Sequence, residues 1–166
     1  MNDNKGNGFQ SFYQSPVGWL KLTSSGNGLT GIWFCESRDE KDFPDEFTGR
    51  AEKQLKEYFD KKRIQFDLPL EITGTGFQKK VWLELLHIPF GKTLSYLELS
   101  KRIGNVKAIR AVGHANGQNP LPIVIPCHRV IGSDGSLTGY GGGLWRKEWL
   151  LKHEGVLPQQ EFGFDF

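Results

Sequence analysis

The pattern of apolar residues changes near residue 72, and this change restricts the chain to a fold of two unlike parts. In the first part, Phe9–Gln14 alternates aromatic and polar side chains, and a Gly-Asn-Gly turn separates Leu20–Ser25 from Leu29–Cys35. These runs predict a β-hairpin within a small sheet. Apolar residues at helical spacing then predict a helix over Thr48–Asp60. We therefore expect a small N-terminal α/β domain over residues 1–72, which ends in an extended linker.

The second part has the signals of short, capped helices. The sequences Thr75-Gly-Phe-Gln and Ser95-Tyr-Leu-Glu are capping boxes, in which a hydroxyl residue is followed three positions later by Gln or Glu. Gly104 ends the second of these helices, and a third helix is expected from Asn105 to about Asn116. Two short helices joined by a Gly-containing turn are typical of a helix-turn-helix motif. Residues 73–166 are therefore expected to form a mainly helical domain packed on the N-terminal one.

Composition excludes several classes of protein. The chain has 166 residues and a formal net charge of +2, and its two cysteines, Cys35 and Cys127, are too few for a disulfide framework. The N-terminus lacks a signal-peptide pattern, and no apolar run approaches the roughly 20 residues of a membrane span. We expect a cytoplasmic protein with free thiols and without a membrane segment.

The distribution of charge is more informative than the total. Residues 99–133 contain no Asp or Glu, although they hold five Lys and Arg residues. On a helical wheel, one side of the third helix is basic and small, and the other side is suited to the core. Small residues beside Arg suit the close approach of a helix to a DNA groove, but a solvated basic surface gives the same pattern. The basic side comprises Lys107, Arg110, Ala111 and His114, and the expected core side comprises Ala108, Ile109, Val112, Ala115 and Asn116.

The segment 119–130 carries the clearest sign of chemistry. Three prolines surround a short β-branched run, and the last of them precedes adjacent Cys127 and His128. A reactive thiol needs a base or a cation nearby, because the thiolate is the nucleophile. Glu154, at the end of an expected helix, is the candidate carboxylate that orients the histidine, as in other catalytic triads. A buried cysteine beside a hydrogen-bonded histidine is the simpler reading of the same residues.

Pro126-Cys127-His128-Arg129-Val130 resembles the active-site motif of the O6-alkylguanine-DNA alkyltransferases, and the resemblance extends over residues 9–157. Further matching segments are Ser15–Gly18, Arg110–Gly113, Asn119–Pro120, Gly139–Tyr140, and Leu144 with Lys147–Leu151. The resemblance implies an N-terminal α/β domain on a mainly helical domain whose helix-turn-helix binds the minor groove of double-stranded DNA. It also implies that a damaged guanine is flipped into a pocket.

The reaction that the resemblance implies is a single, irreversible transfer of a methyl or other alkyl group from O6 of guanine, and from O4 of thymine, to the protein. In this reading Cys127 accepts the alkyl group, His128 takes the thiol proton through a water molecule, and Glu154 orients His128. Asn119 helps to hold the site. No cofactor or metal is needed, and we expect a monomer, with clustering on DNA left open.

The resemblance also assigns residues to the substrate and to DNA. Tyr96 would contact the flipped base, and the backbone around Val130, Tyr140 and Gly141 would line the pocket. Arg110 would fill the space that the base leaves. The residues expected to contact DNA are Lys107, Arg110, Ala111, His114 and Arg129.

Some features depart from the family pattern. Gly141 stands where many members have Ser, which leaves room for adducts larger than methyl. Only Cys35 is present among the N-terminal Cys and His residues that bind zinc in some members, so no zinc is expected. The Phe-rich acidic tail, Glu161–Phe166, suggests no role. Two alternatives stay open: a lesion-binding protein that transfers no alkyl group, and a Cys-His-Glu hydrolase.

Overall fold

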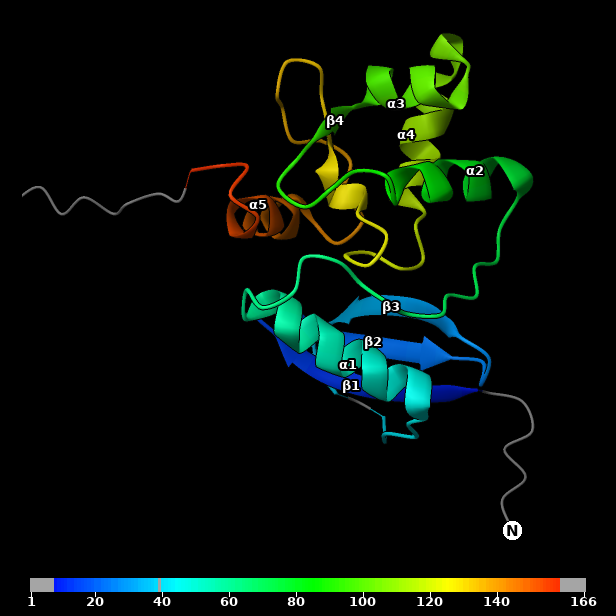
Figure 1. Ribbon diagram of the computed structural model, residues 1–166, viewed down its shortest axis with the longest axis vertical. Coiled ribbons are helices and arrows are strands. Elements are labelled where there is room, and N and C mark those ends of the chain that lie inside the picture. The colour runs from blue at the N-terminus through cyan, green and yellow to red at the C-terminus, as the bar shows by residue number, and fades with distance from the viewer. Residues whose placement is uncertain (1–7, 39, 159–166) are drawn as a thin grey trace, which may run out of the picture.

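The N-terminal part is a three-stranded antiparallel sheet with one helix on its face (Figure 1). The computed structural model describes residues 8–38 and 40–158; the tail segment Glu161–Phe166 lies outside them. The strands β1 (Phe9–Ser15), β2 (Gly18–Ser24) and β3 (Leu29–Cys35) are arranged in the order β1-β2-β3, which confirms the hairpin between the second and third. The helix α1 (Glu46–Phe59) begins at an Asp45 capping box and packs against all three strands.

The C-terminal part is mainly helical. Both predicted capping boxes form, since the Thr75 and Ser95 hydroxyls accept from the backbone N–H groups of Gln78 and Glu98. Two short parallel strands join the start of α3 to the segment that carries Cys127. The elements are α2 (Gly76–Leu85), β4 (Leu94–Ser95), α3 (Tyr96–Ile103), η1 (Val106–Ala108), α4 (Ile109–Gly117), η2 (Cys127–Arg129), β5 (Val130–Ile131) and α5 (Leu144–His153), where η denotes a 3₁₀-helix.

The turn between α3 and α4 differs in detail from the prediction. Gly104 caps α3 in the left-handed region, at φ 92°, as its position predicted. Asn105 caps the short η1 and not α4, so the α-helix begins four residues later than expected. The expectation that Ile109 belongs to the core is wrong: it is the first residue of α4, directly after the 3₁₀ turn, and is 39% exposed.

The free edge of β3 is covered by segments from elsewhere in the chain. At the start of β3, Leu29 forms a parallel bridge with Leu70 of the linker. Further along, the Ile32 N–H donates to the Pro120 carbonyl at 2.9 Å. An edge strand needs such partners because its backbone groups are otherwise unpaired. These bonds fix the sheet against the loop that leads to Cys127.

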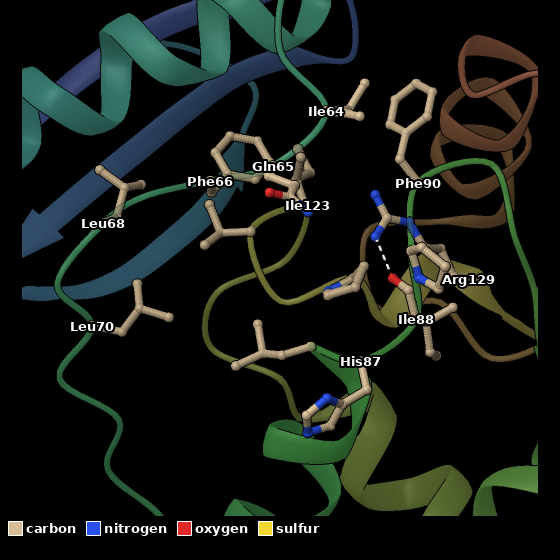
Figure 2. A pocket seen from close by; sticks show the side chains of 14 residues that line it. Ile64, Gln65, Phe66, Leu68, Leu70, His87, Ile88, Phe90, Ile123 and Arg129 are labelled. Atoms are coloured by element: carbon tan, nitrogen blue, oxygen red, sulfur yellow. Dashed lines mark hydrogen bonds between the residues drawn. The ribbon is translucent and has the colours of Figure 1, made fainter.

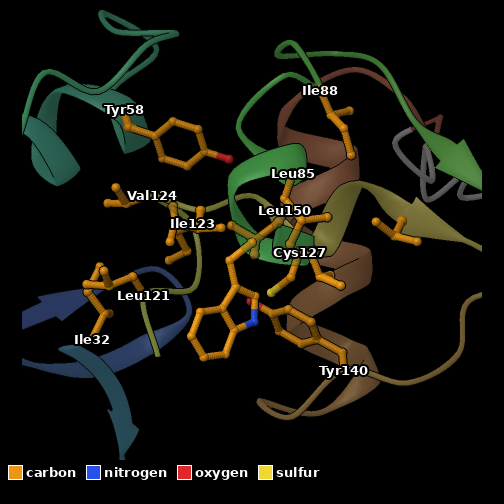
Figure 3. Packing of buried hydrophobic residues seen from close by; sticks show 14 of the residues in the cluster. Ile32, Tyr58, Leu85, Ile88, Leu121, Ile123, Val124, Cys127, Tyr140 and Leu150 are labelled. Carbon is orange, nitrogen blue, oxygen red and sulfur yellow. The ribbon is translucent and has the colours of Figure 1, made fainter. Parts of the chain in front are cut away.

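One apolar core runs through both parts of the molecule. In Figure 3, Leu121 and Val124 of the loop before Cys127 lie between Ile32 of β3 and Tyr58 of α1. On the other side of this loop lie Leu85, Leu150 and further buried residues of the helical part. The loop before Cys127 is thus the middle layer of the core (Figure 1). Its position depends on packing from both sides.

Two glycine substitutions test the roles of a glycine at a helix C-cap and of a glycine within a helix. We expect Gly104→Ala to lower the free energy of unfolding by about 1 kcal/mol, because an L side chain is strained in the left-handed region. Gly49→Ala, within α1 and with open space around the new methyl group, should raise it by about 0.5–1 kcal/mol. Urea unfolding of both variants measures the free energy of unfolding. Changes of the same sign in the two variants would contradict the roles given to Gly104 as a helix cap and to Gly49 as a residue of the helix interior.

Candidate active site

Cys127 begins a single 3₁₀ turn in the middle of the core. Its side chain is only 4% exposed, and its N–H donates to the Ile125 carbonyl at 2.8 Å. Burial raises the pKa of the Cys127 thiol to about 11, although the Asn119 amide and the charge of Lys147 oppose the rise. The thiol is therefore protonated at neutral pH. Any reaction at this sulfur requires a group that removes the proton.

The loop before Cys127 is held by amide side chains. Asn119 donates to the Ile125 carbonyl at 2.7 Å and accepts from the Leu121 N–H at 3.0 Å, so it closes the loop from both directions. Within the loop, Ile123 has a φ of 75°, which is unfavourable for a β-branched residue. Asn116 donates to the Cys127 carbonyl at 3.4 Å. Asn119 thus holds the backbone of the loop that leads to Cys127.

Glu154 is buried at the C-terminal cap of α5 and accepts five hydrogen bonds. One oxygen, Oε1, accepts from Arg129 Nε at 2.8 Å and from the Gly91 N–H at 3.2 Å. The other, Oε2, accepts from His128 Nε2 at 2.6 Å, from the Tyr58 hydroxyl at 2.7 Å and from Arg129 Nη2 at 3.1 Å. Burial alone would raise the pKa of Glu154, but His128 and Arg129 outweigh it and hold the pKa well below its usual range.

His128 is oriented by this carboxylate and has one ring nitrogen to spare. Burial lowers the pKa of His128, although the bond to Glu154 opposes the shift, so the ring is neutral at pH 7. The short contact with Glu154 places the ring proton on Nε2. The other nitrogen, Nδ1, is buried and has no hydrogen-bond partner among the described residues. It is free to accept a proton, and the resulting imidazolium would be stabilised by Glu154.

The expectation that Arg129 contacts DNA is wrong. Its side chain is 6% exposed, forms an ion pair with Glu154, and donates from Nη1 to the Ile88 carbonyl at 2.7 Å (Figure 2). The 3₁₀ turn directs His128 and Arg129 to the same carboxylate. Arg129 also borders a cavity of about 540 Å³ between the two parts of the molecule, together with Phe66, Ile88 and Phe90. Its charge is balanced inside the protein and is not available to a phosphate.

A smaller cavity, of about 250 Å³, opens next to Cys127. Its lining includes Asn119, Tyr140 and Gly141, and Figure 3 shows the sulfur pointing toward the Tyr140 ring. Tyr140 is buried, and Val130 is buried in β5 directly after the 3₁₀ turn. The structure thus brings Tyr140, Gly141 and Asn119 together around the thiol.

Tyr96 belongs to a cluster that holds the glycine-rich loop, residues 132–143. Its hydroxyl donates to the Thr138 carbonyl at 2.8 Å, and Lys147 Nζ donates to the same carbonyl at 2.8 Å. Lys147 is completely buried, and burial lowers the pKa of its ammonium group to about 8. Nζ lies 3.4 Å from the Tyr96 oxygen and over the Tyr96 ring.

Two residues of the site escaped the sequence interpretation. Lys147 was noted only as part of the family pattern; its position among the apolar residues Leu144, Leu150 and Leu151 was the available signal. Tyr58 belongs to the apolar residues at helical spacing that predicted the helix over Thr48–Asp60, yet it bonds to Glu154, 96 residues away. No local pattern announces such a long-range contact.

The basic side of α4 is exposed as predicted. Arg110, Ala111 and His114 are accessible, as is Lys107 of the preceding η1, whereas Val112, Ala115 and Asn116 are buried. The described residues contain no group of three or more His, Cys, Asp or Glu side chains placed to hold a metal ion. In the same part of the chain, no helix is long and apolar enough to cross a membrane.

Comparison with protein-family models finds two matches that cover most of the chain. Residues 9–72 match the ribonuclease-like domain of 6-O-methylguanine DNA methyltransferase. Residues 76–156 match the DNA-binding domain of the same family.

Individual relatives agree with these matches. The methylated-DNA–protein-cysteine methyltransferase of Methanosarcina acetivorans is 45% identical over 153 residues, which are 89% of this chain and 98% of the relative. That of Mycobacterium bovis is 47% identical over 146 residues, or 84% and 88% of the two chains. The crystal structure of Mycobacterium tuberculosis OGT in complex with DNA superposes with a TM-score of 0.80 at 45% identity, covering 88% of this chain and 92% of that one.

The buried histidine predicts a pH dependence of stability. Because the pKa of His128 is lower in the folded state, the unfolded chain binds more protons below its pKa of about 6.5. We expect the free energy of unfolding to fall as the pH drops from 7.5 to 5.5. His128→Gln, which keeps a donor to Glu154 but does not titrate, should reduce this fall.

Urea unfolding at the two pH values measures the effect. His87→Gln, at an exposed histidine, is the control and should keep the wild-type difference. A difference that His128→Gln leaves unchanged would show that His128 is not its source.

Proposed function

The chain belongs to the 6-O-methylguanine DNA methyltransferase family, and on that premise we propose that it repairs alkylated DNA by moving the alkyl group from O6 of guanine to its own Cys127. The observation that carries this proposal is the arrangement of one 3₁₀ turn. It presents a protonated thiol at a cavity and, one residue later, a neutral histidine held by a buried carboxylate.

The proposed step is a displacement at the alkyl carbon. The Cys127 sulfur forms a bond to that carbon as the bond from the carbon to O6 breaks. The thiol proton passes to Nδ1 of His128 through a water molecule, and Glu154 stabilises the resulting imidazolium. The electron pair of the broken bond stays on guanine, which leaves as an anion and takes up a proton. A thioether has no comparable leaving group, so each molecule reacts once.

The substrate enters the cavity as a base flipped out of duplex DNA. Tyr140 and Gly141 line the cavity that receives the base. The backbone at Val130, directly after the 3₁₀ turn, and Tyr96, in the first turn of α3, complete the proposed contacts with it. Gly141 carries no side chain, and a Cβ there would lie 3.3 Å from the Gly117 carbonyl oxygen. O4 of thymine presents a similar alkyl ether to the same thiol.

The basic side of α4 is the proposed contact with DNA. Arg110 enters the minor groove and fills the space that the base leaves, and Ala111 lets the helix approach closely. His114 of α4 and Lys107 of η1, directly before α4, are exposed as well. Arg129 is excluded from this surface because it is buried against Glu154.

The remaining proposals concern the whole chain. We propose that it acts in the cytoplasm, as a monomer that binds damaged double-stranded DNA without a cofactor. We likewise propose two domains, residues 1–72 and 73–166, a division supported by the family models that end at residue 72 and begin at residue 76.

The transfer is tested by intact-protein mass after mixing with a duplex that carries one O6-methylguanine. We expect one added methyl group, located on Cys127 by peptide mapping, restored guanine, and no reaction beyond one equivalent. Cys127→Ser should show no transfer, while Cys35→Ser should react as the wild type does. Tight lesion binding with an unmodified thiol would indicate a lesion-binding protein instead. Repeated turnover of an ester without DNA binding would indicate a hydrolase.

The DNA surface is tested by affinity as a function of salt concentration. Lys107→Ala should weaken binding to undamaged duplex and reduce the slope of log affinity against log salt by about one, because one phosphate contact is lost. Lys53→Ala removes the same charge from the exposed side of α1 and should leave both quantities unchanged. An equal effect of the two substitutions would show that the loss of affinity comes from the change in net charge and not from a phosphate contact of Lys107.

A further inference from the structure

We propose that Phe34, on β3 of the N-terminal part, is a specificity-determining residue: with Tyr140 it forms an aromatic wall that selects flat aromatic alkyl groups. This inference rests on the proposed function and names the substrates that its site favours. The cavity next to Cys127 is lined from both parts of the molecule, with Ile32 and Phe34 on β3 facing Cys127, Tyr140 and Gly142. The sheet therefore takes part in the pocket directly.

The Phe34 ring lies against the segment that forms the other side of the cavity. It makes an edge-to-face contact with Tyr140, with ring centroids 6.0 Å apart. A Cβ added to Gly142 would lie 2.6 Å from Phe34 Cε2, so the ring fills the space that this glycine leaves. Phe34 and Tyr140 thus form one continuous apolar surface beside the thiol.

Arg146 holds this surface in place. Its guanidinium lies over the Phe34 ring, 4.7 Å from the centroid. The same side chain donates from Nε to the Val17 carbonyl and from Nη1 to the Gly142 carbonyl, both at 2.7 Å. The ring is therefore fixed between a cation and the glycine-rich loop. Such a preorganised aromatic group loses little entropy when a ligand packs on it.

The distance between this wall and the thiol is set by the backbone. Ile32, three residues after the bridge between Leu29 and the linker, donates its N–H to the Pro120 carbonyl. Pro120 belongs to the same loop that Asn119 closes in front of Cys127. The next residues of β3 are therefore held in register with the catalytic loop.

The size and lining of the cavity indicate which alkyl groups it suits. Its volume is about 250 Å³, whereas an apolar cavity of roughly 150 Å³ is enough for benzene. The edge of the guanine occupies part of the space, and a methyl group would leave the aromatic wall without contact. A benzyl group on O6 is long enough to pack on Phe34 and Tyr140 in the offset or edge-to-face arrangements that aromatic rings favour.

The test compares single-turnover rates on duplexes carrying O6-benzylguanine and O6-methylguanine. We expect Phe34→Ala to lower the ratio of the benzyl rate to the methyl rate by roughly tenfold, which corresponds to about 1.4 kcal/mol. Phe34→Trp, which keeps an aromatic wall, should keep the ratio within about threefold of the wild-type value. The ratio separates selectivity from a general loss of activity.

Phe43→Ala makes the same change at an exposed phenylalanine of the N-terminal part, stacked on Phe9 and outside the cavity, and should leave the ratio unchanged. A Phe34→Ala ratio that stays constant or rises would overturn the inference. If the wild-type protein transfers no alkyl group from either duplex to Cys127, the proposed function fails instead. If Phe34→Ala does not fold, Phe34→Leu gives the same comparison, with the ratio again expected to fall.

Discussion

The carboxylate of Glu154 lies in the interior, and its negative charge determines how the residues around it are arranged. A buried charge is tolerated only when cations and hydrogen-bond donors compensate for its lost hydration. Arg129 and His128 supply these from the 3₁₀ turn, Gly91 supplies a backbone N–H, and Tyr58 supplies a hydroxyl from the other part of the molecule. Removing one member of such a group commonly costs about 3–5 kcal/mol, because the remaining charges are then unpaired.

This one group connects the catalytic turn to the join between the two parts. Tyr58 is packed among Phe59, Phe66, Phe90 and His153, so its hydroxyl can reach Glu154 only when α1 is seated on the helical part. Glu154 in turn fixes the tautomer of His128. The helix α1 therefore contributes to the chemistry from outside the cavity, through the orientation of the base.

Local signals predicted the local structure well, and they failed where distant residues decide. The Thr75 and Ser95 capping boxes and the left-handed Gly104 depend on neighbours within four residues, and each forms as the sequence indicated. Arg129 was expected among the residues that contact DNA. Its partner is Glu154, 25 residues further on, and only the fold brings the two together. Tyr58 was missed for the same reason, since its partner Glu154 is 96 residues away.

The burial of Cys127 has two opposite effects, and the site needs both. A low dielectric raises the pKa of the thiol and so protects the sulfur from oxidation and from adventitious electrophiles, which react with the thiolate. The same burial lowers the pKa of His128 and keeps its Nδ1 unprotonated. A thiol that holds its proton and a base that lacks one are thus placed side by side in the chain. A single-use nucleophile gains from this arrangement, because a cysteine consumed by a stray reaction cannot be recovered.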